Sequence, residues 1–208
     1  MKSAIIAGVF AATAAMGQTI KQSEPFFLKV TSSNLTIDGK FLYSCHAGAA
    51  LQTLCLGSRD VPTTNVNSAT FYLNTTVYEG KESDTGNLIW NLVLAPGADG
   101  SQQIVSEPLT FQYTPGSNVA ITWFAPGYPT QPEVGFNNSA LFVNSYPDDS
   151  HFTDTYPEQF TSTRISNWYA CWVLAGSYYY NALSWVTAGA PHNPTCQSVS
   201  VIKVDVSA

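Results

Sequence analysis

Charged side chains are scarce in this chain, and basic ones are the scarcest. Only 11% of its 208 residues are Asp, Glu, Lys or Arg, against about 25% in typical globular domains. Eight basic and fourteen acidic residues give a net charge of −6, and no run of Lys or Arg occurs. Proteins that bind a phosphate backbone need such basic clusters, so we expect no nucleic-acid partner.

The sequence signatures of common catalytic sites are missing as well. The chain has no G-x-S-x-G motif, no glycine-rich phosphate loop and no C-x-x-C pair, which serine hydrolases, nucleotide sites and many zinc sites use. Its three histidines, His46, His151 and His192, follow no metal-ligand spacing. We therefore expect a protein without catalytic activity, cofactor or metal, in which His46 and His192 have structural roles beside nearby cysteines.

No hydrophobic run after the N-terminus approaches the roughly 20 residues that span a bilayer. The apolar stretch Ala4–Ala15 follows a single basic residue, and small residues occupy the −3 and −1 positions of a cut before Gln18. This pattern is typical of a secretory signal peptide at residues 1–17. We expect a secreted, extracellular protein without membrane insertion, free or held at the cell wall, with one domain at residues 18–208.

Cysteine and asparagine patterns agree with an extracellular location. The chain has four cysteines, Cys45, Cys55, Cys171 and Cys196, and an even number in a secreted chain predicts two disulfides. Of three possible connectivities we favour the local one, which joins the first two and the last two, because each pair sits in its own segment. Three N-x-S/T sequons are candidate glycosylation sites: Asn34, Asn74 and Asn137.

Short strand-like patches separated by Gly, Pro, Asn and Asp clusters dominate the mature chain. About ten such strands predict an all-β fold, an antiparallel sandwich or barrel-like domain with two disulfides. Trp168–Leu174 is apolar on both faces, so we expect a central strand that is covered on both sides or lies against a second sheet. Pro108 separates two apolar patches, residues 79–84 have the character of a solvated turn, and Asn144–Asn167 lacks strand character.

The irregular segment Asn144–Asn167 is the first candidate for a binding site, because β scaffolds usually present binding residues on loops. It interleaves acidic and aromatic residues, and the predicted binding set is Asp148, Asp149, His151, Asp154 and Tyr156. Its acidic groups have no calcium-loop spacing. A solvated loop without a function is the competing interpretation.

Two further hypotheses concern glycans of a cell wall or a host. A glycan hydrolase would need two facing carboxylates roughly 5–9.5 Å apart, and the candidates are Glu79, Glu82, Asp84, Asp148, Asp149, Asp154 and Glu158. A glycan-binding module would instead expose a row of Tyr and Trp. In the run Tyr178–Tyr180 we expect Tyr179 to face opposite to its neighbours, with one ring exposed and the others in the core.

Two parts of the chain carry a family resemblance. Residues 40–50 read Lys-Phe-Leu-Tyr-Ser-Cys-His-Ala-Gly-Ala-Ala, and residues 191–196 read Pro-His-Asn-Pro-Thr-Cys. With Leu-Cys-Leu at 54–56 and the strand that begins at Trp168, they resemble small secreted proteins of filamentous fungi known only as a domain of unknown function. The resemblance covers most of residues 25–204. It implies an extracellular fungal protein with two local disulfides and assigns no catalytic residue.

Overall fold

The computed structural model describes residues 18–64, 66–97, 99–127, 131–146, 153–155 and 163–206. These residues form one short helix, α1 (Val66–Ala69), and fifteen strands. The strands are β1 (Thr19–Gln22), β2 (Phe26–Thr31), β3 (Leu42–Gly48), β4 (Leu51–Leu56), β5 (Phe71–Tyr78), β6 (Lys81–Val93), β7 (Ile104–Gln112), β8 (Val119–Phe124), β9 (Val134–Asn137), β10 (Ala140–Tyr146), β11 (Thr163–Ile165), β12 (Trp168–Ala175), β13 (Tyr178–Val186), β14 (Gln197–Ser198) and β15 (Ser200–Asp205).

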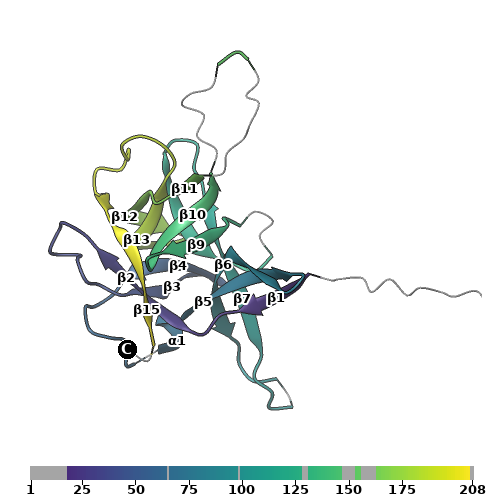
Figure 1. The fold of residues 1–208 in the computed structure, drawn as a ribbon. Coiled ribbons are helices and arrows are strands. Elements are labelled where there is room, and N and C mark those ends of the chain that lie inside the picture. Colours follow the sequence, from purple (N-terminus) through teal and green to yellow (C-terminus); the bar gives the residue numbers. More distant parts are fainter. Residues whose placement is uncertain are drawn as a thin grey trace, which may run out of the picture.

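One group of strands, here called sheet A, curls into a closed ring. Its order is β5, β2, β15, β10, β9 and β6, and β6 pairs with β5 again. The last strand of the chain lies beside an early one, because β15 pairs with β2 over six residues (Figure 1). β1 and β11 add to the outside of this ring by pairing with β5 and β10.

A second group, sheet B, consists of β3, β4, β8, β13, β12 and β14. β7 joins the two sheets: it pairs with β6 as far as Pro108 and with β8 from Leu109 onward. Proline has no N–H to give to a ladder, and Pro108 stands where the strand changes partners. The two predicted patches are therefore one strand that passes from sheet A to sheet B.

The main core is shared by both sheets. It contains Phe26, Leu28 and Phe71 from sheet A and Leu54, Trp168 and Trp185 from sheet B. Trp168 and Trp185 are directly opposite on β12 and β13, with ring centroids 4.8 Å apart in an edge-to-face arrangement. The buried indole N–H of Trp168 donates a hydrogen bond of 2.9 Å to the Leu141 carbonyl of β10. This bond joins the sheets without leaving a buried donor unpaired.

The predicted all-β antiparallel class is confirmed, since every described pairing between named strands is antiparallel. The described residues hold fifteen strands rather than about ten, and the strands that were missed are the shortest. One of them, β11, lies inside the segment predicted to have no strand. The expected solvated turn at 79–84 is confined to Glu79 and Gly80, and β6 already begins at Lys81.

Both predicted disulfides are present, and both lie in sheet B. Cys45–Cys55 joins the paired strands β3 and β4, with Cα atoms 6.0 Å apart. Cys171–Cys196 joins β12 to the segment before β14, with Cα atoms 4.1 Å apart. Such bridges persist in oxidising compartments and are compatible with an extracellular protein. Among the described residues no helix is long and apolar enough to cross a membrane.

Candidate functional site

The β12–β13 hairpin extends beyond the core that it helps to build. The core-facing side of β12 begins with Trp168 and Ala170, which are buried. The same side continues with Trp172 and Leu174, whose exposed fractions are 44% and 63%. Of the two expected arrangements, cover on both sides does not hold for the second half of the strand. Alternation correctly assigns side chains to faces but cannot say where the opposite sheet ends.

Three exposed side chains on this face form what we call the aromatic strip: Trp172, Leu174 and Tyr179. Tyr179 is directly opposite Leu174 on β13 and has an exposed fraction of 64%. Its ring stacks on the Trp172 indole, with centroids 5.2 Å apart and planes inclined by 21°. A stacked cross-strand pair holds both rings in fixed positions, so the strip is a preorganised apolar surface in contact with solvent.

The opposite face of the hairpin also carries aromatic rings. Tyr178 stacks on Tyr180 at 5.9 Å and meets the exposed His46 ring edge-to-face at 5.5 Å. The Tyr180 hydroxyl donates to the His46 carbonyl at 2.9 Å, which ties β13 to β3. Burial, together with the nearby Tyr180, raises the pKa of the Tyr43 phenol on this side. The predicted alternation is confirmed, but two rings of the Tyr178–Tyr180 run are well exposed rather than one.

The turn of the hairpin presses against β3. Gly176 has a φ of +61°, and a Cβ atom there would lie 1.9 Å from the Ala47 carbonyl oxygen. Only glycine meets both conditions, the left-handed backbone and the close approach. The tip that carries the aromatic strip is thus fixed against its neighbour.

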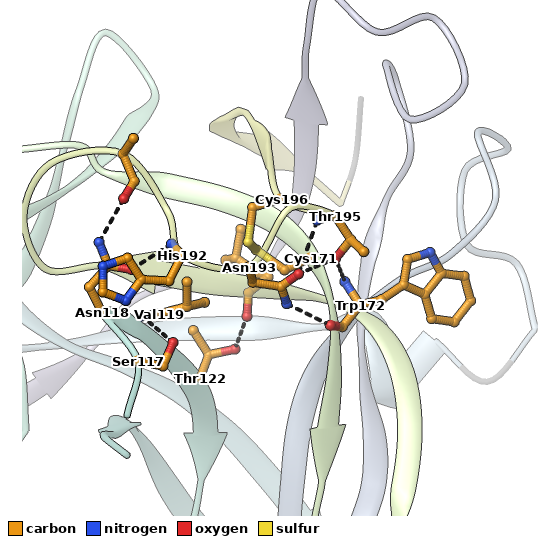
Figure 2. Close-up of a disulfide and its surroundings, with 12 residues drawn as sticks. Ser117, Asn118, Val119, Thr122, Cys171, Trp172, His192, Asn193, Thr195 and Cys196 are labelled. Atoms are coloured by element: carbon orange, nitrogen blue, oxygen red, sulfur yellow. Dashed lines mark hydrogen bonds between the residues drawn. A yellow bond between two sulfur atoms is a disulfide. The ribbon is translucent and has the colours of Figure 1, made fainter. Parts of the chain in front are cut away.

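Side chains of a loop take the place of a strand along the outer edge of β12 (Figure 2). The Trp172 backbone N–H donates to the Thr195 hydroxyl at 3.0 Å, and the Asn193 amide donates to the Trp172 carbonyl at 2.9 Å. The Thr195 hydroxyl in turn donates to the Asn193 side-chain oxygen at 2.7 Å. The Trp172 backbone is therefore paired on this edge, while its indole points away from the loop into the open.

Asn118 fixes the remainder of that loop. Its side-chain amide donates to the carbonyls of Ala188 and Ala190, each at 2.8 Å, and its oxygen accepts the His192 backbone N–H at 2.8 Å. Together with Cys171–Cys196, these bonds hold residues 187–196 over sheet B (Figure 2). His192 and His46, which lie near Cys196 and next to Cys45 in the sequence, are both exposed.

The structure describes only part of the loop that the sequence favoured. Asp148, Asp149, His151 and Tyr156 lie outside the residues that the structure describes. Asp154 is described and exposed, and its carboxylate accepts a 3.5 Å contact from the neighbouring Thr155 hydroxyl. The candidate surface on β12 and β13 is a different place, built from strands rather than from an irregular loop.

The described carboxylates among the hydrolase candidates each have their own surroundings. Glu82 and Asp84 form separate exposed ion pairs of 2.6 Å with Lys21 and Arg164. Hydrogen bonds from Lys21 and the Thr75 hydroxyl lower the pKa of Glu82, whereas a general acid needs a raised one. Glu79 occupies the tight turn before β6, and Glu158 lies outside the described residues.

Glu107 is the unexpected acidic residue of the structure. It faces the core from β7, opposite Trp90 of β6, and its exposed fraction is 0%. Neither carboxylate oxygen has a hydrogen-bond partner within the described residues, and desolvation raises its pKa to about 7. A raised pKa is typical of catalytic acids, but a side chain sealed from solvent cannot reach a substrate. Glu107 is therefore a destabilising core group at high pH.

The three sequon asparagines have different surroundings. Asn137 is exposed at the end of β9, beside the turn at residues 138–139. Asn74 lies within β5 between two paired strands and accepts a 2.9 Å bond from Gln22. The Asn34 side-chain oxygen accepts from the Thr36 hydroxyl at 2.8 Å, and its amide donates to Gln197 at 2.6 Å. Asn137 is therefore the most open of the three.

A groove of about 390 Å³ lies at the other end of β3, between the segment 57–64 and α1. Tyr43, Asp60 and Ser68 are among the residues that line it. It has a single carboxylate and no exposed pair of rings. No group of three or more His, Cys, Asp or Glu side chains in the described ranges is placed to hold a metal ion. The aromatic strip is therefore the candidate functional site.

Comparison of the chain with curated proteins and with solved structures finds no match. Comparison with protein families finds one that spans the fold from β2 to β15. The match covers residues 23–205, and the chain belongs to this family, a domain of unknown function designated DUF7907.

Proposed function

We propose that this protein is a non-catalytic, secreted fungal domain that binds glycans of a cell wall or a host through the aromatic strip. The observation that carries the proposal is the exposed Trp172–Tyr179 stack, with Leu174 beside it, on a hairpin that a disulfide and a glycine turn hold in place. Aromatic faces carry negative partial charge. They attract the C–H bonds on the apolar face of a pyranose ring.

The distribution of exposed apolar residues supports this choice of surface. Within eight residues of sequence, four large apolar side chains are well exposed: Trp172, Leu174, Tyr178 and Tyr179. Three of them, Trp172, Leu174 and Tyr179, share one face. Single exposed apolar residues are ordinary on a protein surface, whereas such a contiguous group marks a binding site. Rigid aromatic side chains lose little conformational entropy on binding, which suits a ligand that offers few contacts.

Replacing Trp172 with alanine is expected to weaken glycan binding at least tenfold. Loss of an aromatic anchor costs about 2 kcal/mol of binding free energy, and 1.4 kcal/mol corresponds to tenfold. Tyr179→Ala should have a similar effect because it removes the other half of the stack. The measurement is binding of wild type and variants to an array of cell-wall and host glycans.

The matched control is Tyr78→Ala, which removes another exposed tyrosine, at the end of β5 in sheet A. It should leave binding unchanged. Thermal unfolding of all three variants should stay close to that of wild type, because exposed substitutions cost little stability. If Trp172→Ala and Tyr179→Ala bind as wild type does, the aromatic strip is not the site.

The proposal includes secretion and N-glycosylation. Expressed in a eukaryotic host, the protein should appear in the medium with Gln18 as its first residue, and Asn137, the most open sequon asparagine, should carry a glycan. Intact-mass and N-terminal analysis check both points. Asn137→Gln should lower the mass by one glycan without changing glycan binding. A chain that starts before Ala15, or one that stays in the cell, would contradict secretion.

A further inference from the structure

Sheet B carries no charged side chain. Asp, Glu, Lys and Arg are absent from three long segments: 41–58, 108–132 and 165–202. These segments contain all of β3, β4, β8, β12, β13 and β14. The charged residues of the described chain lie in sheet A, in β7 before Pro108 and in the loops. The strands of the sheet that presents the aromatic strip thus contain no ionic group.

The groups around the strip can form hydrogen bonds without charge. Asn181 lies opposite Trp172 on β13, and Asn193 and Thr195 follow the outer edge of β12 beside it. Tyr179 adds a phenol hydroxyl to the strip itself. The ionisable His46 ring lies on the opposite face of the hairpin, against Tyr178. Because Asn193 and Thr195 are bonded to the Trp172 backbone and to each other, the surface offers a ligand the aromatic faces, the Asn181 amide and the Tyr179 hydroxyl.

We infer that the ligand of the aromatic strip is a neutral polysaccharide, an inference that rests on the proposed function and narrows it. An anionic polymer needs Lys or Arg to replace its counterions, and a cationic polymer needs carboxylates. Sheet B has neither. A neutral sugar chain needs flat apolar contact and uncharged hydrogen-bonding groups, and the strip and its surroundings have both.

The size of the exposed surface favours a sugar chain over a protein partner. A stable protein interface uses about 20–30 residues on each side, whereas the aromatic strip consists of three large exposed side chains. A second copy of the chain is the competing occupant. If a second copy covers the strip, the protein is a dimer in solution, and the oligomeric state of the protein therefore distinguishes this occupant from a polysaccharide.

The test measures binding of the full secreted protein to insoluble polymers in 20 mM and 500 mM NaCl. The neutral probes are chitin, β-1,3-glucan and mannan; the charged probes are polygalacturonate and chitosan. We expect binding to at least one neutral polymer, with a change of less than twofold between the two salt concentrations. The charged polymers should not retain the protein in 500 mM NaCl. Trp172→Ala should release the protein from the neutral polymer, and Tyr78→Ala should not.

Each other outcome overturns one specific statement. Binding only to a charged polymer, with a loss of more than tenfold in high salt and with Trp172 still required, overturns neutrality but leaves the proposed function intact. Binding to a neutral polymer that Trp172→Ala does not change overturns the proposed function. Binding to none of the probes overturns this inference. A dimer in light scattering that Trp172→Ala converts to a monomer assigns the strip to a second copy and overturns it too.

Discussion

Wild-type protein is expected to lose roughly 3 kcal/mol of stability relative to a Glu107→Gln variant when the pH rises from 4 to above 8. The cause is the unpartnered core carboxyl of Glu107, whose pKa burial raises from 4.5 to about 7. A shift of one pKa unit corresponds to 1.36 kcal/mol. The glutamine variant has a similar shape and cannot ionise.

The sign of this pH effect follows from the pKa of Glu107 in the unfolded and in the folded state. Below pH 4.5 the carboxyl is neutral in both states, so Glu107 has no pH-dependent effect. Between pH 4.5 and about 7 the unfolded chain ionises while the folded one keeps its proton, and stability falls as the pH rises. Above about pH 7 the folded state is charged as well, and the loss levels off. Urea unfolding of both proteins at pH 4, 5.5, 7 and 8.5 measures the difference.

Glu82→Gln is the matched control with the opposite sign. The pKa of Glu82 is lowered by hydrogen bonds from Lys21 and Thr75, so its contribution is present above the unfolded pKa and is lost as the pH falls through the folded one. The wild-type advantage over Glu82→Gln should therefore shrink toward low pH. A stability difference between wild type and Glu107→Gln that is constant across the range would show that Glu107 is not desolvated as described.

Removing the Cys171–Cys196 bridge is expected to cost more stability than removing Cys45–Cys55. The sequence separations are 25 and 10 residues, and the chain-entropy relation gives about 3.5 and about 2.7 kcal/mol. The double alanine variants are measured by urea unfolding under non-reducing conditions. Each variant also loses a cysteine that is almost fully buried, Cys171 or Cys55. Cys45 is buried as well, whereas Cys196 is partly buried, so lost burial works against the expected order and the loop-length effect must exceed it.

The two disulfide variants should also differ in glycan binding. Cys171 lies next to Trp172, and Cys196 follows the residues that pair with the Trp172 backbone. Loss of this bridge should loosen the β12 edge and weaken binding, whereas loss of Cys45–Cys55 should affect binding less. If removal of Cys45–Cys55 causes the larger loss of stability and of binding, Cys171–Cys196 is not the bridge that supports the aromatic strip.

The sequence predicted the fold class, the disulfide pairing and a domain of unknown function, and these are confirmed. The fold class was predictable because alternation and turn residues are local signals in the sequence. The pairing was predictable because each bridge joins cysteines of the same part of the chain. The short strands β1, β11 and β14 were missed because two to four residues are too few to show a period. The change of sheet at Pro108 depends on which strands lie nearby, which a single sequence does not reveal.

The candidate site was harder to predict than the fold. Trp172 and Leu174 have the same alternation as buried Trp168, and only the tertiary structure shows that the opposing sheet has ended. Glu107 in a core position is equally invisible, since its neighbours in sequence do not show that it faces Trp90. One sequence signal was present: three long segments without any charged residue. The longest of them, 38 consecutive residues at 165–202, contains β12 and β13 and so includes the aromatic strip.

The central claim, that the aromatic strip binds a neutral sugar chain, is tested most directly by nuclear magnetic resonance. Soluble oligosaccharides with the structure of the neutral polymer that binds the protein are titrated into isotope-labelled protein. The indole N–H of Trp172 and the ring signals of Tyr179 should shift in proportion to saturation, while the indole signals of buried Trp90 and Trp168 stay in place. Shifts confined to the groove beside α1, or to residues 144–167, would contradict the account.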